Sequence, residues 1–206
     1  LCKGAPTTLA ASIAYCQPFY SIGTGAGDYI GRVAITGTTL NNITTGAGSP
    51  YYTLFPASGT TTASLVAGST YTLVLSPGTY AFSNQLAAWI DYNQDKSFSG
   101  DEKLGQVLIS AAYPTTANIV FTVPASAKNG QVRLRVREAF NNSNIDPCKN
   151  WTYGETEDYL LTLSGGGVAS AIVFDWDNGT TPSSGASVIA TPDYSQAYTV
   201  TVTDVH

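Results

Sequence analysis

Gln131-Val-Arg-Leu-Arg-Val-Arg137 is the stretch that decides the fold, because apolar and basic residues alternate through it without a break. Successive side chains of a β-strand point to opposite faces of a sheet, so Val132, Leu134 and Val136 are expected on one face and the arginines on the other. No window of helical length elsewhere in the chain shows a convincing 3.6-residue period. The segment therefore predicts a strand whose apolar row faces a core.

Other strand candidates lie on both sides of this segment and are separated by turns rich in Gly, Ser, Pro and Asn. They cover residues 28–35, 51–55, 69–75, 87–90, 117–123 and 157–163. Short strands at regular spacing with turn signals between them are typical of a sandwich or barrel. We expect an all-β fold, an antiparallel β-sandwich of jelly-roll or immunoglobulin-like type.

Ser164-Gly-Gly-Gly167 predicts a flexible boundary after the last of these strands. Residues 1–14 are expected to be a lead-in segment and residues 15–164 the sandwich. Residues 165–206 hold too few strand candidates for a full sandwich of about 100 residues. They are expected to form a second, small or partial β-module at the C-terminus.

The composition excludes several classes of function. Of 206 residues only 11% are charged, with 9 basic against 14 acidic residues, whereas nucleic-acid binding needs a clustered basic surface. No apolar run approaches the roughly 20 residues of a membrane span, so neither nucleic acid nor membrane insertion is expected. The chain contains no Met, and we expect it to be a processed piece of a longer protein.

Few residues are available for catalysis. The single histidine is the last residue, His206, which argues against a Ser-His-Asp triad, a Cys-His dyad or an HExxH zinc site. Cys2, Cys16 and Cys148 show no CxxC spacing, and in an oxidising compartment one pair with one cysteine left over is the simplest arrangement. The sequence predicts that the chain is not an enzyme.

The sharpest motif is the acidic loop Asp91-Tyr-Asn-Gln-Asp-Lys-Ser-Phe-Ser-Gly-Asp-Glu102. Oxygen ligands fall at the first, third, fifth, seventh and twelfth positions, as in a calcium loop. We expect these residues to bind calcium: Asp91, Asn93, Asp95, Ser97 (through its carbonyl) and Glu102. Lys96 stands at the sixth position, where Gly normally permits a sharp turn, and no helices flank the loop. The alternative is a solvated acidic hairpin.

A second group of acids, Glu155, Glu157 and Asp158, lies on the predicted strand 157–163 and the residues before it. The first two share one strand face and the third points to the other. The favoured interpretation is structural charge pairing with Arg133, Arg135 and Arg137 on a neighbouring strand. A contribution to a second metal site and a glycosidase-type carboxylate pair are the alternatives.

Loop aromatics are candidates for contact with a glycan or partner, because such rings stack on sugars or fill interfaces. The residues concerned are Phe19, Tyr20, Tyr52 and Trp151. The alternative is that they cap the ends of the core.

Taken together, these motifs resemble the GEVED domain of secreted and surface proteins of the Bacteroidota type. The resemblance covers roughly residues 15–164 and rests on Tyr15-Cys16-Gln-Pro18, Gly27-Asp-Tyr-Ile30, Ala67-Gly-Ser-Thr-Tyr-Thr-Leu73, Trp89-Ile-Asp-Tyr-Asn-Gln-Asp95, Phe121-Thr-Val-Pro124, the arginine strand, Pro147-Cys148 and Gly154-Glu-Thr-Glu-Asp-Tyr159. Thr156 stands where the family has Val. Residues 168–206 resemble part of an immunoglobulin-like or PKD-like repeat.

The resemblance implies a β-sandwich module of multidomain secreted or surface-anchored proteins. Family members often have two further cysteines that this chain lacks, so the resemblance implies a Cys16–Cys148 disulfide and leaves Cys2 without a partner in the module. We expect a non-catalytic, calcium-stabilised extracellular module that serves adhesion or display. Its partners would be other domains of the same polypeptide and a glycan or surface protein. The alternative is a carbohydrate-binding accessory module of a secreted hydrolase or peptidase.

Overall fold

The computed structural model describes residues 6–11, 13–25, 27–168, 171–177, 184–192 and 195–205. The chain forms two compact units: Cys16–Val168, and Leu1–Tyr15 together with Ala169–His206. Cys2 and His206 lie outside the described residues. The described residues contain no helix that is long and apolar enough to cross a membrane.

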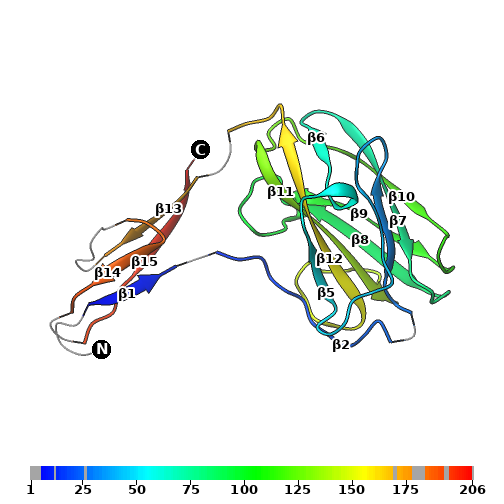
Figure 1. Ribbon diagram of the computed structural model, residues 1–206, viewed down its shortest axis with the longest axis horizontal. Helices are drawn as coiled ribbons and strands as arrows, with labels where there is room; N and C mark the ends of the chain where they lie inside the picture. Colours follow the sequence, from blue (N-terminus) through cyan, green and yellow to red (C-terminus); the bar gives the residue numbers. More distant parts are fainter. Residues whose placement is uncertain are drawn as a thin grey trace. The chain divides into compact units, whose positions relative to one another are not determined.

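The larger unit consists of strands with two short 3-10 helices, η1 and η2 (Figure 1). In chain order its elements are β2 (Tyr20–Gly23), β3 (Ile30–Ile35), β4 (Asn41–Ile43), β5 (Tyr52–Phe55), η1 (Gly59–Thr61), β6 (Ser64–Val66), β7 (Thr70–Pro77), β8 (Asn84–Ile90), η2 (Gly100–Glu102), β9 (Lys103–Ile109), β10 (Ala117–Thr122), β11 (Gly130–Phe140) and β12 (Trp151–Ser164).

These strands form two sheets with the order β10-β7-β3-β4 and β2-β12-β11-β8-β9. Buried apolar side chains of both sheets form one core, which includes Val33 and Leu73 from the first and Leu86, Leu134 and Leu161 from the second. The all-β sandwich is therefore confirmed. The apolar row of the decisive stretch lies in this core, as its alternation predicts.

The central feature of the larger sheet is β12, which pairs antiparallel with β11 along one edge. Its other edge is covered in succession by β2, β5 and β6, and all three run parallel to it. The sheet is therefore mixed, whereas the expected sandwich was antiparallel. Three short strands from the first third of the chain thus fix the position of one long strand near its end (Figure 1).

The smaller unit contains β1 (Thr7–Ala10), β13 (Ala171–Trp176), β14 (Ser187–Ala190) and β15 (Val200–Val205). β1 pairs with β14, and β13 pairs with β15, in both cases antiparallel. The residues expected to be a lead-in thus contain a strand, which local sequence did not reveal because its partner lies near the other end of the chain.

Candidate functional site

The acidic loop begins where β8 ends, at the fully buried Asp91. The Asp91 carboxylate accepts the backbone N–H of Asp95 (3.2 Å) and of Lys96 (3.0 Å). Asn93 Oδ1 also accepts the N–H of Asp95 (3.0 Å), and Asp95 Oδ1 accepts the N–H of Ser97 (2.7 Å). The first, third, fifth and seventh positions therefore share one compact turn.

Two residues of this turn have left-handed backbone conformations, Gln94 with φ +60° and Lys96 with φ +63°. Glycine adopts this region freely, whereas other residues pay a cost of about 1 kcal/mol or more. The sixth position thus has the backbone conformation of the calcium loop's glycine, although Lys96 occupies it. The loop is held by its hydrogen bonds in spite of that cost.

Glu102, at the twelfth position, is buried and joins the two ends of the loop. Its Oε1 accepts the N–H of Tyr92 (3.0 Å), and its Oε2 accepts the N–H of Ser99 (2.8 Å). Burial raises the pKa of this carboxyl, the nearby Asp91 charge raises it further, and the N–H donors oppose the rise. A cavity of about 200 Å³ lies beside the loop and is lined in part by Asn93 and Glu102.

Within the described residues, no three Asp, Glu, His or Cys side chains converge closely enough to hold a metal ion. The loop oxygens instead accept backbone N–H groups of the loop itself. The calcium site remains a prediction of the loop's spacing.

Several segments of the chain meet at the side chain of Arg135, which is fully buried in β11. Asp158 on β12 accepts two bonds from it, from Nε to Oδ1 and from Nη2 to Oδ2, both 2.8 Å long. The same guanidinium donates to the carbonyls of Cys16 (2.7 Å) and Pro147 (2.9 Å). The Phe98 ring of the acidic loop lies 4.7 Å from it. Arg135 therefore holds the acidic loop and two surface segments on one face of the sheet.

A disulfide joins Cys16 to Cys148 directly beside this group, with an S–S distance of 2.02 Å, and confirms the pairing that the family resemblance implied. Arg135 Nη1 lies 2.9 Å from Cys16 Sγ. The bond links segments 132 residues apart. Because Arg135 already binds the carbonyl of Cys16, the disulfide and the buried ion pair fix the same region twice.

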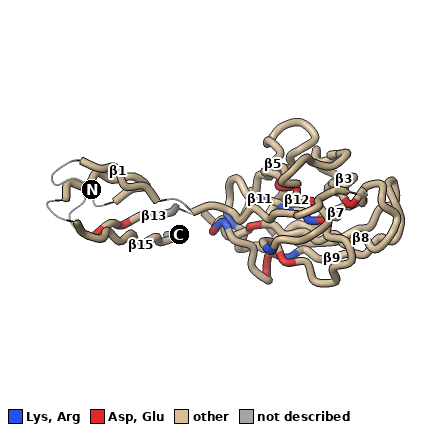
Figure 2. The backbone as a smooth tube through the Cα atoms, turned by 90° about the horizontal axis from the view of Figure 1, so that it is seen from below, with Lys and Arg blue, Asp and Glu red and all other residues tan. Residues whose placement is uncertain are grey.

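The predicted pairing of three arginines with three acids is correct only for Asp158. Asp158 lies opposite Arg135 in the β11–β12 register, and opposite residues share a sheet face. It also receives Arg133 Nη1 at 3.2 Å. Glu155 and Glu157 occupy alternate positions and point into the sandwich instead, so the prediction that they pair with arginine is wrong. In Figure 2 the basic and acidic positions of β11 and β12 lie within the larger unit.

Gly154 begins the acidic motif of β12 and has φ +132°. A Cβ atom there would lie 2.1 Å from the backbone oxygen of Glu138 on β11. Only glycine allows the two strands to approach this closely at that point. In the sequence this glycine stands out only as the first residue of the Gly154–Tyr159 motif, because its structural role depends on the position of β11.

Residues 85–162 match the GEVED domain. The match runs from β8 to Thr162 in β12, and it includes the acidic loop, the arginine strand, Cys148 and the acidic motif of β12. It confirms the resemblance over that part of the predicted range. No curated protein matches the chain. The Bacteroidota context and the repeat-like character of residues 168–206 remain predictions.

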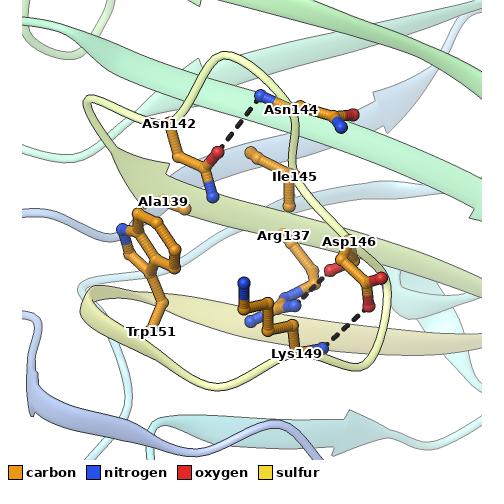
Figure 3. Close-up of a pocket in the computed structure, with 8 residues that line it drawn as sticks. All are labelled: Arg137, Ala139, Asn142, Asn144, Ile145, Asp146, Lys149 and Trp151. Carbon is orange, nitrogen blue, oxygen red and sulfur yellow. Dashed lines mark hydrogen bonds between the residues drawn. The ribbon is translucent and has the colours of Figure 1, made fainter.

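The GEVED segment contains a cavity of about 120 Å³ beside Trp151, on the loop between β11 and β12 (Figure 3). Arg137 and Lys149 point into the same space next to the indole ring. Asn142, Asn144 and Asp146 complete its polar wall, and Asp146 Oδ1 accepts the N–H of Cys148 (2.7 Å) and of Lys149 (2.9 Å). Two cations, two amides and one aromatic ring, beside a single carboxylate that already accepts backbone N–H groups, suit a ligand that carries a carboxylate or another oxyanion.

Arg137 is held firmly in this wall and is almost fully buried. Its Nε donates to the Tyr20 hydroxyl (2.9 Å) and to Thr156 Oγ1 (3.1 Å), and its Nη1 donates to the carbonyl of Asp146. Its Nη2 has no partner among the described residues. The guanidinium is thus fixed by neutral acceptors and makes no ion pair among the described residues.

The four candidate aromatics differ in their exposure within the larger unit. Tyr20 is fully buried, and its hydroxyl lies among Glu138, Thr156 and Arg137, so the prediction that it contacts a ligand is wrong. Its strand, β2, packs it under β12, which sequence alone did not show. Tyr52 is half-buried and donates its hydroxyl to Asp158. Phe19 (45% exposed) and Trp151 remain accessible.

Proposed function

We propose that the chain is a non-catalytic, calcium-stabilised extracellular module of a larger secreted or cell-surface protein, which serves adhesion or display. The observation that carries this proposal is the Cys16–Cys148 disulfide beside the buried Arg135–Asp158 pair. Disulfides form and persist in oxidising compartments such as the cell exterior. A module that is cross-linked by this disulfide keeps its exposed loops in fixed positions. Binding sites commonly lie on loops that a rigid scaffold holds in place.

The charged side chains of the sheet support a non-catalytic role. Arg135 and Asp158 bind one another, and Arg137 is bound to neutral acceptors. The only histidine is at the C-terminal end of the chain. Activity assays on glycoside, ester and peptide substrates should give no turnover. Hydrolysis that disappears in Glu155→Gln or Glu157→Gln would contradict the proposal.

Calcium binding is proposed at the loop between Asp91 and Glu102, where buried carboxylates mark both ends of a tight turn. A ligand that binds only the folded state stabilises it by mass action, by about 2.7 kcal/mol at 100 times the Kd. Calcium should therefore raise the melting temperature of the wild-type chain above its value in chelator. Asp91→Asn should abolish this response, whereas Asp175→Asn, which removes an exposed charge in the smaller unit, should keep it.

Unchanged melting of the wild-type chain at millimolar calcium would show that the loop is a structural hairpin. The same conclusion would follow if Asp91→Asn responded to calcium as the wild type does. Circular dichroism of each variant in chelator separates loss of calcium binding from loss of the fold.

The cavity beside Trp151 favours a second candidate function, a carbohydrate-binding module for acidic sugars. The indole offers a stacking surface, while Arg137 and Lys149 offer charge for a sugar carboxylate or sulfate. A glycan array with neutral and acidic sugars tests it. Selective binding of acidic glycans should be lost in Trp151→Ala and weakened in Lys149→Ala. Phe82→Ala, which removes an exposed ring that does not line the cavity, is the matched control.

A blank array for the folded wild-type chain would reject the carbohydrate-binding candidate and favour adhesion through a protein partner. Binding that survives in both cavity variants would place the glycan elsewhere on the module. Binding of neutral glycans alone would contradict the role given to the two cations.

A further inference from the structure

Four acidic side chains lie in the interior of the larger unit, away from the arginines. Glu138 on β11 and Glu155 on β12 are direct register partners, and Glu157 lies opposite the core residue Val136. All three therefore project from the core face of the sheet. Asp28, just before β3, is the fourth, and each of the four is at most 3% exposed.

Two of these carboxylates accept hydrogen bonds. Glu155 accepts the N–H of Ile30 (3.1 Å) and of Ala47, and Glu157 binds the hydroxyls of Tyr159 (2.6 Å) and Thr44. Among the described residues, neither oxygen of Glu138 has a hydrogen-bond partner, nor does Asp28 Oδ1 or Glu157 Oε1. Within the described part of the chain, no ion pair reaches any of the four.

Four ionised carboxylates without counter-charges would be unstable in the protein interior. Burial raises the pKa of Glu138 well above its ordinary range, and the charges of Asp28 and Glu155 raise it further. Buried charges in proteins are normally paired or bound to a metal. A proton could neutralise Glu138, but its single O–H would still leave the other oxygen without a donor, whereas a cation bound by both oxygens satisfies them together.

A cavity lies next to these four acids. Its volume is about 190 Å³, and it is lined by Asp28, Tyr80, Phe140 and Tyr153. Phe140 and Tyr153 each lie two positions from Glu138 and Glu155, respectively, along the same strands, so their side chains continue the same inward-facing rows. The cavity thus borders the acidic group.

We propose that Asp28, Glu138, Glu155 and Glu157 form an interior site for a hard divalent cation of the calcium class. The available donors are all oxygens, which hard cations prefer. No three acids of the described residues already lie in metal-holding geometry, so binding turns the Glu138 side chain toward its neighbours. It has no hydrogen bond to break. The site does not depend on the Asp91 loop.

The test is calcium titration calorimetry on the whole chain, at concentrations up to about 5 mM, because extracellular calcium sites bind at 10⁻⁴–10⁻³ M. The wild type and Asp175→Asn should each bind two equivalents. Glu138→Gln keeps the shape but removes the charge, and it should bind one equivalent. Asp91→Asn should also bind one, and the double variant none.

The outcomes separate this site from the proposed loop site. The interior site would be overturned if Glu138→Gln still bound two equivalents of calcium. It would also be overturned if the wild type bound only one equivalent and Asp91→Asn bound none. Loss of one equivalent in Glu138→Gln with no effect of Asp91→Asn would uphold the interior site and reject the loop. Near-ultraviolet circular dichroism checks the fold, and Glu157→Gln is the second variant if Glu138→Gln does not fold.

Discussion

Removal of one partner of the buried Arg135–Asp158 ion pair is expected to destabilise the larger unit strongly. Asp158 is fully buried and accepts two 2.8 Å bonds from Arg135, one of 2.8 Å from the Tyr52 hydroxyl and one of 3.2 Å from Arg133. Asp158→Asn removes the negative charge and turns an amide toward the guanidinium. Breaking a buried pair in this way costs about 3–5 kcal/mol, since it leaves an uncompensated charge.

Urea denaturation at pH 7 measures this loss as a lower midpoint with an unchanged slope. A double-mutant cycle of Asp158→Asn, Arg135→Met and Arg135→Met/Asp158→Asn isolates the pair, and the double variant should lose less stability than the two single changes added together, because no unpaired Arg135 charge then remains buried. Arg133→Met is the matched control. Without Arg133, Asp158 keeps both bonds from Arg135 and the bond from the Tyr52 hydroxyl, so the change should cost only about 1 kcal/mol. A loss below about 1 kcal/mol in Asp158→Asn, or additivity of the two single changes, would refute the argument.

Three further predictions concern the Cys16–Cys148 disulfide, the close approach of β11 and β12 at Gly154, and the buried Glu155. Reduction of the Cys16–Cys148 bond should lower stability by up to about 5 kcal/mol on the chain-entropy model, and a urea midpoint that does not move with reductant would contradict it. Gly154→Ala should cost at least about 2 kcal/mol, because its Cβ would meet a backbone oxygen at 2.1 Å, whereas Gly48→Ala has open space and should be nearly neutral in the same assay. Burial raises the pKa of Glu155 in the folded chain to about 7 from 4.5, so the native state holds the extra proton between these values. In chelator the urea midpoint should therefore fall as the pH rises from about 4.5 to about 7, by less in Glu155→Gln, and a rising midpoint would show the opposite sign.

The sequence alone determined the features that depend on local pattern. The alternation at 131–137 predicted a strand with a buried apolar row, and that row lies in the core. Turn signals separated most strands correctly, because Gly, Pro and Asn act through local backbone geometry. The same alternation extends beyond residue 137. Glu138 continues the row of Val132, Leu134 and Val136, so an acid at a core-facing position was already visible in the printed sequence.

Only the tertiary structure decided which charges meet. Glu155, Glu157 and Asp158 are close in sequence, but the register between β11 and β12 sends Asp158 to Arg135 and both glutamates into the interior. The burial of Tyr20 under β12, the parallel strands along that edge, and the pairing of β1 with β14 depend on partners far away in the chain. An alternating sequence indicates only that the strand has one apolar and one polar face. Which face is covered, and by what, is decided by the segments that pack on it, and no local pattern contains that information.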